Sequence, residues 1–91
     1  MQNMTRRLSR REIGEIVAKF KRAPTYFLSQ IHDPLISQLL ELHYIKGLEW
    51  WKVANAINYS EQNVYKLRRR ALAILADIIS KEDKTHGKKD N

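Results

Sequence analysis

The sequence lacks cysteine, and its 91 residues include three glycines and two prolines. Without cysteine the chain has no disulfide framework and no thiolate ligands for a metal ion. So few glycines and prolines leave little material for β-turns or glycine-rich phosphate loops. No apolar run approaches the ~18–20 residues that span a bilayer, and the first residues lack the apolar stretch of a secretory signal. We therefore expect an all-α, cytoplasmic protein.

The chain contains enough apolar material for one core. Hydrophobic residues make up 43% of it and charged residues 30%, which is too apolar for a disordered chain. A chain of this length corresponds to one small domain. We expect a single helical domain of four or five helices over residues 1–80 and a flexible charged tail over residues 81–91, where no apolar residue remains.

Positive charge exceeds negative charge, with 17 Lys and Arg against 10 Asp and Glu, a net charge of +7. The excess lies in residues 1–22 and 60–80, and the segment 23–59 between them is nearly neutral. A basic excess on two predicted helices is typical of a protein that lies on a polyanion, and nucleic acid is the first candidate. Charge alone leaves open a basic surface that only keeps a small protein soluble.

Local signals predict a basic amphipathic helix over residues 8–23. Ser9 and Glu12 have the spacing of a capping box, and the helix ends before Pro24 because proline disfavours helical geometry in the preceding residue. The apolar segment 25–31 fits either a short helix or a packed connector. The basic helix also has the form of a membrane-surface anchor, but a single core needs its apolar face, so we expect no membrane binding.

Three further helices follow. Asp33 and Pro34 predict the start of a helix that runs to Lys46, and Gly47 is expected to end it in the left-handed conformation. A helix over residues 49–57 follows. Its predicted end lies at Asn58, which also tolerates the left-handed conformation.

Ser60 is then the predicted cap of a long helix from Glu61 to about Ser80. The short connection between this helix and the preceding one has the length of the turn in a helix-turn-helix. In that motif the second helix lies in the major groove of DNA, and residues near its start reach base edges.

The last predicted helix has one apolar and one polar face. The apolar face contains Val64, Leu67, Ala71 and Leu75, and the opposite face carries the base-reading candidates Gln62, Tyr65, Lys66 and Arg69. Lys52, Ser60, Arg68 and Arg70 are better placed for contacts to the phosphate backbone.

The stretch from Leu42 to Leu72 resembles region four of bacterial sigma factors, and resembles more closely the small phage late-gene regulators of the ArpU and RinA type. In those proteins an (Arg/His)-Tyr-x-x-Gly segment runs into a Trp-x-x-(Ile/Val)-Ala helix, followed by a Tyr-Ser turn and a Val-x-x-(Leu/Ile)-x-x-x-Ala-Leu recognition helix. The residues that match in register are Tyr44, Gly47, Trp50, Val53, Ala54, Tyr59, Ser60, Val64, Leu67, Ala71 and Leu72.

This resemblance implies a sigma-region-four-like part over residues 34–80, with the helix-turn-helix over residues 49–79. It implies a phage or prophage transcriptional regulator that binds double-stranded DNA in a bacterial host, with late-gene activation as the leading expectation and repression left open. The family's promoter-reading positions fall at Glu61, Gln62, Tyr65 and Lys66. Glu49 stands where the sigma family has a Thr or Ser cap and Tyr65 where it has an Arg, so a standard promoter sequence is not the expected target.

Other functions and partners remain as alternatives. A small terminase-type protein that binds a DNA-packaging site also uses a helix-turn-helix. A protein-only adaptor that docks on RNA polymerase is the contrasting class, with Trp51, Arg10 and Arg11 as its possible partner surface. A homodimer or docking to polymerase would add the specificity that a motif this small lacks.

The two adjacent tryptophans have different expected roles. Trp50 shares a face with Val53 and Ile57, which predicts core packing. Trp51 points roughly the other way, so either the N-terminal helix covers it or it contributes to a partner surface.

Catalysis has little support in this sequence. The Ser, His and acidic residues are too scattered to nominate a triad, and no element forms a cleft. His32, His43 and His86 have no metal-ligand spacing among them, and His43 is expected to be structural. We expect a protein that is not an enzyme and that needs neither metal nor cofactor.

Overall fold

The computed structural model describes the backbone of residues 7–90 and the side chains of residues 7–82. Within this part of the chain every regular element is helical, which confirms the all-α class. The elements are α1 (Arg10–Arg22), α2 (Pro24–Ser29), α3 (Pro34–Leu40), the π-helical turn η2 (Glu41–Ile45), α4 (Trp50–Ile57) and α5 (Glu61–Asp90). None of the described helices is both long enough and apolar enough to cross a bilayer.

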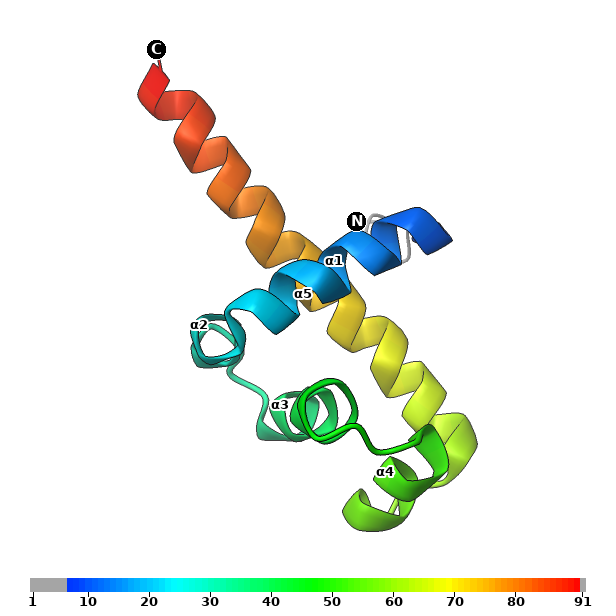
Figure 1. Ribbon diagram of the computed structural model, residues 1–91. Helices are drawn as coiled ribbons and strands as arrows, with labels where there is room; N and C mark the ends of the chain where they lie inside the picture. The colour runs from blue at the N-terminus through cyan, green and yellow to red at the C-terminus, as the bar shows by residue number, and fades with distance from the viewer. Residues whose placement is uncertain (1–6, 91) are drawn as a thin grey trace.

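The long helix α5 is the element on which the others are assembled. α1 crosses its middle, α3 and α4 pack along its first half, and its C-terminal part projects beyond them (Figure 1). The core lies where these helices meet, and its largest fully buried side chains are Phe20, Ile36, Leu39, Leu40, Val53, Val64, Leu72 and Leu75. The first half of α5 therefore packs against α3 and α4.

The predicted start of α1 is confirmed by its hydrogen bonds. The Glu12 backbone N–H donates to Ser9 Oγ at 3.1 Å, and the Ser9 backbone N–H donates to Glu12 Oε1 at 2.9 Å, which completes a capping box. α1 ends at Arg22, and Pro24 begins the next helix directly. The segment left open between a helix and a connector is thus mainly helical, with Phe27 buried.

The helix that begins at Pro34 departs from the prediction in its second half. Asp33 Oδ1 accepts from the Leu35 N–H at 3.0 Å, as expected of an N-cap. From Glu41, however, the helix widens to π geometry, and the Lys46 N–H donates to the Glu41 carbonyl at 2.9 Å. Gly47, with φ of 80°, ends it in the left-handed conformation as predicted.

The closing hydrogen bonds of η2 each span one residue more than those of an α-helical Schellman cap. They join the Leu48 N–H to the Leu42 carbonyl at 3.0 Å and the Gly47 N–H to the His43 carbonyl at 3.1 Å. The spacing of apolar residues in the sequence gives no sign of this wider turn. Ring packing of Tyr44 against α1, and of His43 against α4, accompanies it.

α5 extends further than the sequence predicted. The expected end at Ser80 is too early, because the helix continues to Asp90 and the segment 81–90 has a helical backbone. Lys, Glu and Asp are compatible with helix even where no core remains to cover. A pair between Lys81 Nζ and Asp77 Oδ2 at 3.4 Å, one turn apart, also bridges the predicted end.

Candidate functional site

The connection between α4 and α5 is fixed by backbone hydrogen bonds. Asn58 adopts the left-handed conformation, with φ of 62°, as predicted. The Tyr59 N–H donates to the Ala54 carbonyl at 3.0 Å and the Asn58 N–H to the Asn55 carbonyl at 3.3 Å, which together form a Schellman cap. Ser60 Oγ then accepts from the Asn63 N–H at 3.2 Å and caps α5. This short turn sets the direction of α5 relative to α4.

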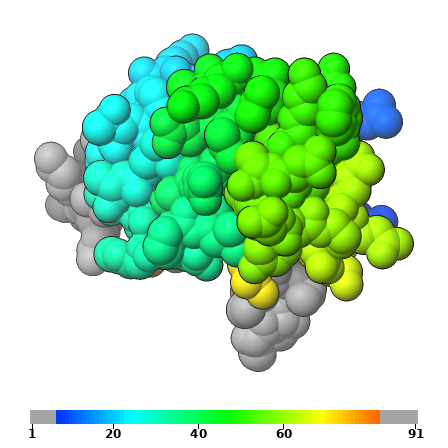
Figure 2. Space-filling model, turned by 90° about the horizontal axis from the view of Figure 1, so that it is seen from below, coloured from blue at the N-terminus to red at the C-terminus, as the bar shows by residue number. Residues whose placement is uncertain are grey.

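The first turns of α5 separate a buried face from an exposed one. Val64, Ala71 and Leu75 are 0% exposed and form the inner face. The outer face holds every base-reading candidate, and all of them are exposed: Glu61, Gln62, Tyr65, Lys66 and Arg69. Positions three, four and seven residues apart lie on one helical stripe, so Gln62, Lys66 and Arg69 share a surface. Figure 2 shows the start of α5 next to α4 on one face of the molecule.

The positive charges in the first turns of α5 have no acidic partners among the described side chains. The ion pair recorded there joins Lys81 to Asp77, further along α5. Lys66, Arg68, Arg69 and Arg70 pair with no carboxylate in that part of the chain. Uncompensated cations on one helix create a positive potential that attracts anions.

The four candidates for phosphate contacts differ in their surroundings. Lys52, Ser60 and Arg70 are exposed, and Lys52 Nζ lies 5.4 Å from the centroid of the Trp51 ring. Arg68 is half-buried, and its guanidinium carbon lies 5.9 Å from the centroid of the Trp50 ring. Arg68 therefore has a more fixed position than a solvated arginine.

An aromatic cluster joins η2, α4 and α5. His43 stacks on Trp50 with ring centroids 3.7 Å apart and planes inclined by 14°. Trp50 also contacts Tyr44 at 6.0 Å and Tyr65 at 6.3 Å between centroids. Trp50 is half-buried and packs against the core, so the expected core role is confirmed, but its ring is shared with the aromatic cluster.

His43 is anchored within this cluster. Its Nδ1 lies 2.7 Å from the Leu48 carbonyl oxygen, which can only accept, so Nδ1 is the donor. Burial lowers the pKa of His43, the nearby cations Arg68 and Lys21 lower it further, and the hydrogen bond to Leu48 opposes them. The structural role expected for His43 is confirmed. Its stacking on Trp50 had no signal in the sequence, because Gly47 breaks the helical register between them.

Trp51 lies outside the aromatic cluster. It is 48% exposed, so the N-terminal helix does not cover it. Its Nε1–H donates to Glu49 Oε1 at 2.6 Å, and Glu49 makes no side-chain cap bond to α4. Glu49 stands at the position where a Thr or Ser cap is expected. It holds the exposed indole of Trp51 instead of capping α4. Arg10 and Arg11 begin α1, away from α4 in Figure 1, so the three partner-surface candidates do not form one patch.

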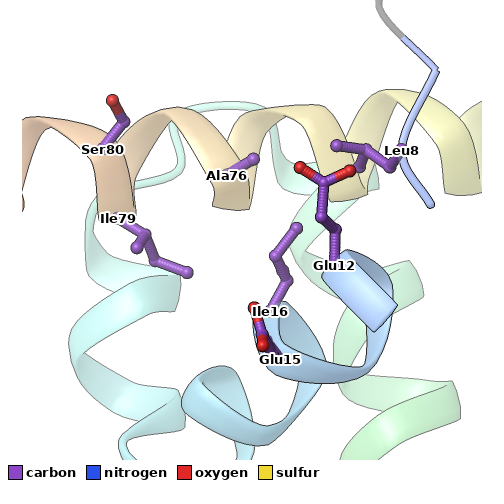
Figure 3. A pocket seen from close by; sticks show the side chains of 7 residues that line it. All are labelled: Leu8, Glu12, Glu15, Ile16, Ala76, Ile79 and Ser80. Atoms are coloured by element: carbon purple, nitrogen blue, oxygen red, sulfur yellow. The ribbon is translucent and has the colours of Figure 1, made fainter. Parts of the chain in front are cut away.

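A groove between α1 and α5 was not predicted. Its volume is about 230 Å³, and Figure 3 shows its lining side chains: Leu8, Glu12, Glu15, Ile16, Ala76, Ile79 and Ser80. The Glu12 side chain extends from α1 toward α5 in this view. The groove carries acidic groups, which distinguishes it from the basic surface at the start of α5.

Comparisons of the chain with protein families, with curated proteins and with solved structures find no match. The resemblance to sigma region four therefore remains a prediction from the residues quoted for it. The functional argument rests on the exposure, charge and contacts of the side chains around α4 and α5.

Proposed function

We propose that this chain is a sequence-specific, double-stranded DNA-binding transcriptional regulator. In this proposal α4, the turn at Asn58 and α5 act as a helix-turn-helix, and the start of α5 enters the major groove. The observation that carries the proposal is the exposed stripe of Gln62, Tyr65, Lys66 and Arg69, whose cations lack acidic partners among the described side chains. The turn at Asn58 and the buried opposite face hold this stripe in one orientation.

The exposed residues supply the chemistry that base reading requires. The Gln62 amide can pair with adenine through two hydrogen bonds, and Lys66 and Arg69 can donate to the O6 and N7 acceptors of guanine. Glu61 can accept from the amino group of cytosine, and Tyr65 can contact a thymine methyl group or a sugar. This combination favours a mixed target sequence over a single type of base pair.

The backbone contacts come from residues that flank this stripe. Lys52, Ser60 and Arg70 are exposed, and Arg68 is half-buried with its guanidinium carbon 5.9 Å from the centroid of the Trp50 ring. Such contacts fix the register of the protein on DNA without reading sequence. They also make the affinity fall steeply as salt concentration rises.

The biological setting follows from the sequence resemblance. It supports a phage or prophage gene-control protein that acts in a bacterial host, with activation of late genes as the leading role. A second copy on a paired half-site, or RNA polymerase beside the DNA, would supply the additional contacts that a motif this small needs.

The double variant Lys66→Ala with Arg69→Ala tests the proposal directly. We expect specific binding to a selected duplex to fall by at least about 30-fold, because each base-reading pair contributes about 1–3 kcal/mol. The melting temperature should not change, because both side chains are exposed. A matched control, Lys21→Ala with Lys46→Ala, removes the same charge from exposed positions outside the site. Equal affinity for both double variants would contradict the proposal.

A second candidate function is a protein-only adaptor, which the exposed and anchored Trp51 favours. Tryptophan is enriched at the residues that contribute most to protein interfaces. In this case Trp51→Ala would abolish co-purification with RNA polymerase, whereas the Lys66 and Arg69 substitutions would have no effect on it. The regulator proposal expects the reverse for DNA binding. The Lys66 and Arg69 substitutions should abolish specific binding, and Trp51→Ala should leave it unchanged.

A further inference from the structure

One flank of α1 carries charges that are ordered by sign along the helix. Glu12, Glu15, Lys19 and Arg22 all belong to α1, and a rotation of about 100° per residue places them within an arc of about 80°. Glu12 and Glu15 lie in the first half of the helix, and Lys19 and Arg22 lie in its second half. This charged flank is therefore negative toward one end of α1 and positive toward the other.

The negative half of the charged flank borders the groove between α1 and α5. Glu12 and Glu15 line this groove together with apolar side chains, which are Ile16 of α1 and Ala76 and Ile79 of α5 (Figure 3). Ala76 and Ile79 are half-buried, so the second wall of the groove is a partly accessible apolar surface of α5. The groove thus combines an apolar lining with two carboxylates.

Three of the four charged side chains are exposed and lack ion-pair partners. Glu15, Lys19 and Arg22 are exposed, and none of them forms an ion pair within the part of the chain whose side chains are described. Glu15 and Lys19 are one helical turn apart but do not pair with each other there. Their charges are consequently available to groups outside the chain.

The lining of the groove defines the chemistry of an occupant. Lys and Arg side chains can bury their apolar stems against a surface such as Ile79 while their charged ends reach carboxylates. Two basic side chains spaced like Glu12 and Glu15 would satisfy both parts of this lining. A phosphate backbone would be repelled by the same carboxylates.

The charged flank of α1 itself supplies such a pair. When two α1 helices lie antiparallel and are centred at the level of Val17, Glu15 of one copy stands opposite Lys19 of the second copy, and Glu12 stands opposite Arg22. Two-fold symmetry repeats both pairs. A parallel arrangement in register would place like charges opposite each other, which is unfavourable. The pattern is therefore self-complementary in the antiparallel arrangement.

We propose that two copies of this chain associate through antiparallel α1 helices, with Lys19 and Arg22 of each copy seated at the acidic groove of the other. The inference goes beyond the proposed function and holds without DNA. The interface uses α1 and the middle of α5, so the base-reading stripe at the start of α5 stays exposed in both copies. It gives the basic helix α1 a role that the sequence analysis left open.

Charge reversal on the charged flank tests this arrangement. Glu15→Lys and Lys19→Glu each place like charges opposite each other, whereas the combined variant restores both pairs with their signs exchanged. Glu41→Lys, at an exposed position in η2, is the matched control for the change in net charge. Sedimentation equilibrium of the full chain over a concentration series measures self-association, and thermal unfolding establishes that each variant keeps its fold.

We expect the unchanged protein to dimerise with a dissociation constant on the order of micromolar, because one helix pair buries a small interface. Each single reversal should weaken the dimer at least about tenfold, because attraction becomes repulsion at two symmetric places. The combined variant should return to within about threefold of the unchanged protein, and Glu41→Lys should match it. Self-association should also weaken between ~0.05 M and ~0.5 M salt, because exposed charge pairs are screened.

Three results would overturn the inference. A chain that stays monomeric at all concentrations would show that α1 forms no such interface. A combined variant as weak as the single reversals would refute the antiparallel pairing. Opposite effects of Glu15→Lys and Lys19→Glu would show that only net charge matters. None of these results bears on DNA binding by α5, so a failure of this inference is distinguishable from a failure of the proposed function.

Discussion

His43 couples the stability of the fold to pH at the scale of a single residue. Its ring is stacked on Trp50, and its Nδ1 is bonded to the Leu48 carbonyl at 2.7 Å. Burial is the main cause that lowers the pKa of His43 below the ordinary value of 6.5, and Arg68 and Lys21 act in the same direction. The folded chain therefore binds a proton at this site less readily than the unfolded chain does.

This difference predicts that the melting temperature falls on mild acidification. As pH falls below about 6.5, the unfolded chain takes up the proton first, so stability is lost until pH passes below the folded pKa. We expect the drop between about pH 7.5 and about pH 5.5 to be smaller in His43→Gln than in the unchanged protein. His32→Gln, at an exposed position, is the control and should retain the full drop. An identical drop in His43→Gln would refute this role.

At the scale of helical elements, replacing glycine by alanine should have opposite effects on stability at two positions. Gly14 lies inside α1, and a Cβ atom built there meets nothing within 4 Å, whereas Gly47 ends η2 with φ of 80°. Alanine at Gly14 should stabilise the protein by about 0.5–1 kcal/mol, because glycine lowers helix stability by that amount.

Alanine at Gly47 should instead destabilise it by about 1–2 kcal/mol, because a Cβ atom is strained in the left-handed region. Denaturant unfolding of both variants measures these changes in the free energy of unfolding. Destabilisation by Gly14→Ala would show that α1 packs more closely at this position than its open surroundings indicate.

Element boundaries were predictable where the signal is local. The capping box at Ser9, the N-cap at Asp33 and the left-handed residues Gly47 and Asn58 each depend on a few neighbouring residues, and all of them are found. The π turn at Glu41 was not predictable, because an apolar stripe tolerates a local widening of the helix. The extension of α5 was missed because the prediction treated the loss of apolar residues as the end of the helix.

At the scale of the whole molecule, one part of the candidate site was predictable from the sequence, namely the exposed face of α5. The exposed face of α5 follows from the 3.6-residue period once Val64 is placed in the core, and the structure confirms this exposure. The packing of Phe20 of α1 against Tyr44 of η2 was not predictable, because it depends on how α1 packs across η2 and α5. Such contacts between distant segments have no signature in the sequence of either segment.

The separation of charge over the whole molecule also bears on partners. Uncompensated cations lie along the first turns of α5, while Glu12 and Glu15 lie at the groove between α1 and α5. A polyanion should therefore be attracted to the start of α5, as it also is to the exposed basic residues of α1. The groove would repel it, so docking on DNA would be oriented by the protein's own field.

Selection of bound DNA from a random duplex pool, at near-physiological salt, tests the central claim most directly. The account predicts enrichment of a short sequence motif, because Gln62, Lys66 and Arg69 present base-reading groups from one helical face. The same selection with the Lys66 and Arg69 double variant should give no enriched motif. Binding without enrichment by the unchanged protein would reduce these side chains to general phosphate contacts and would contradict a sequence-specific regulator.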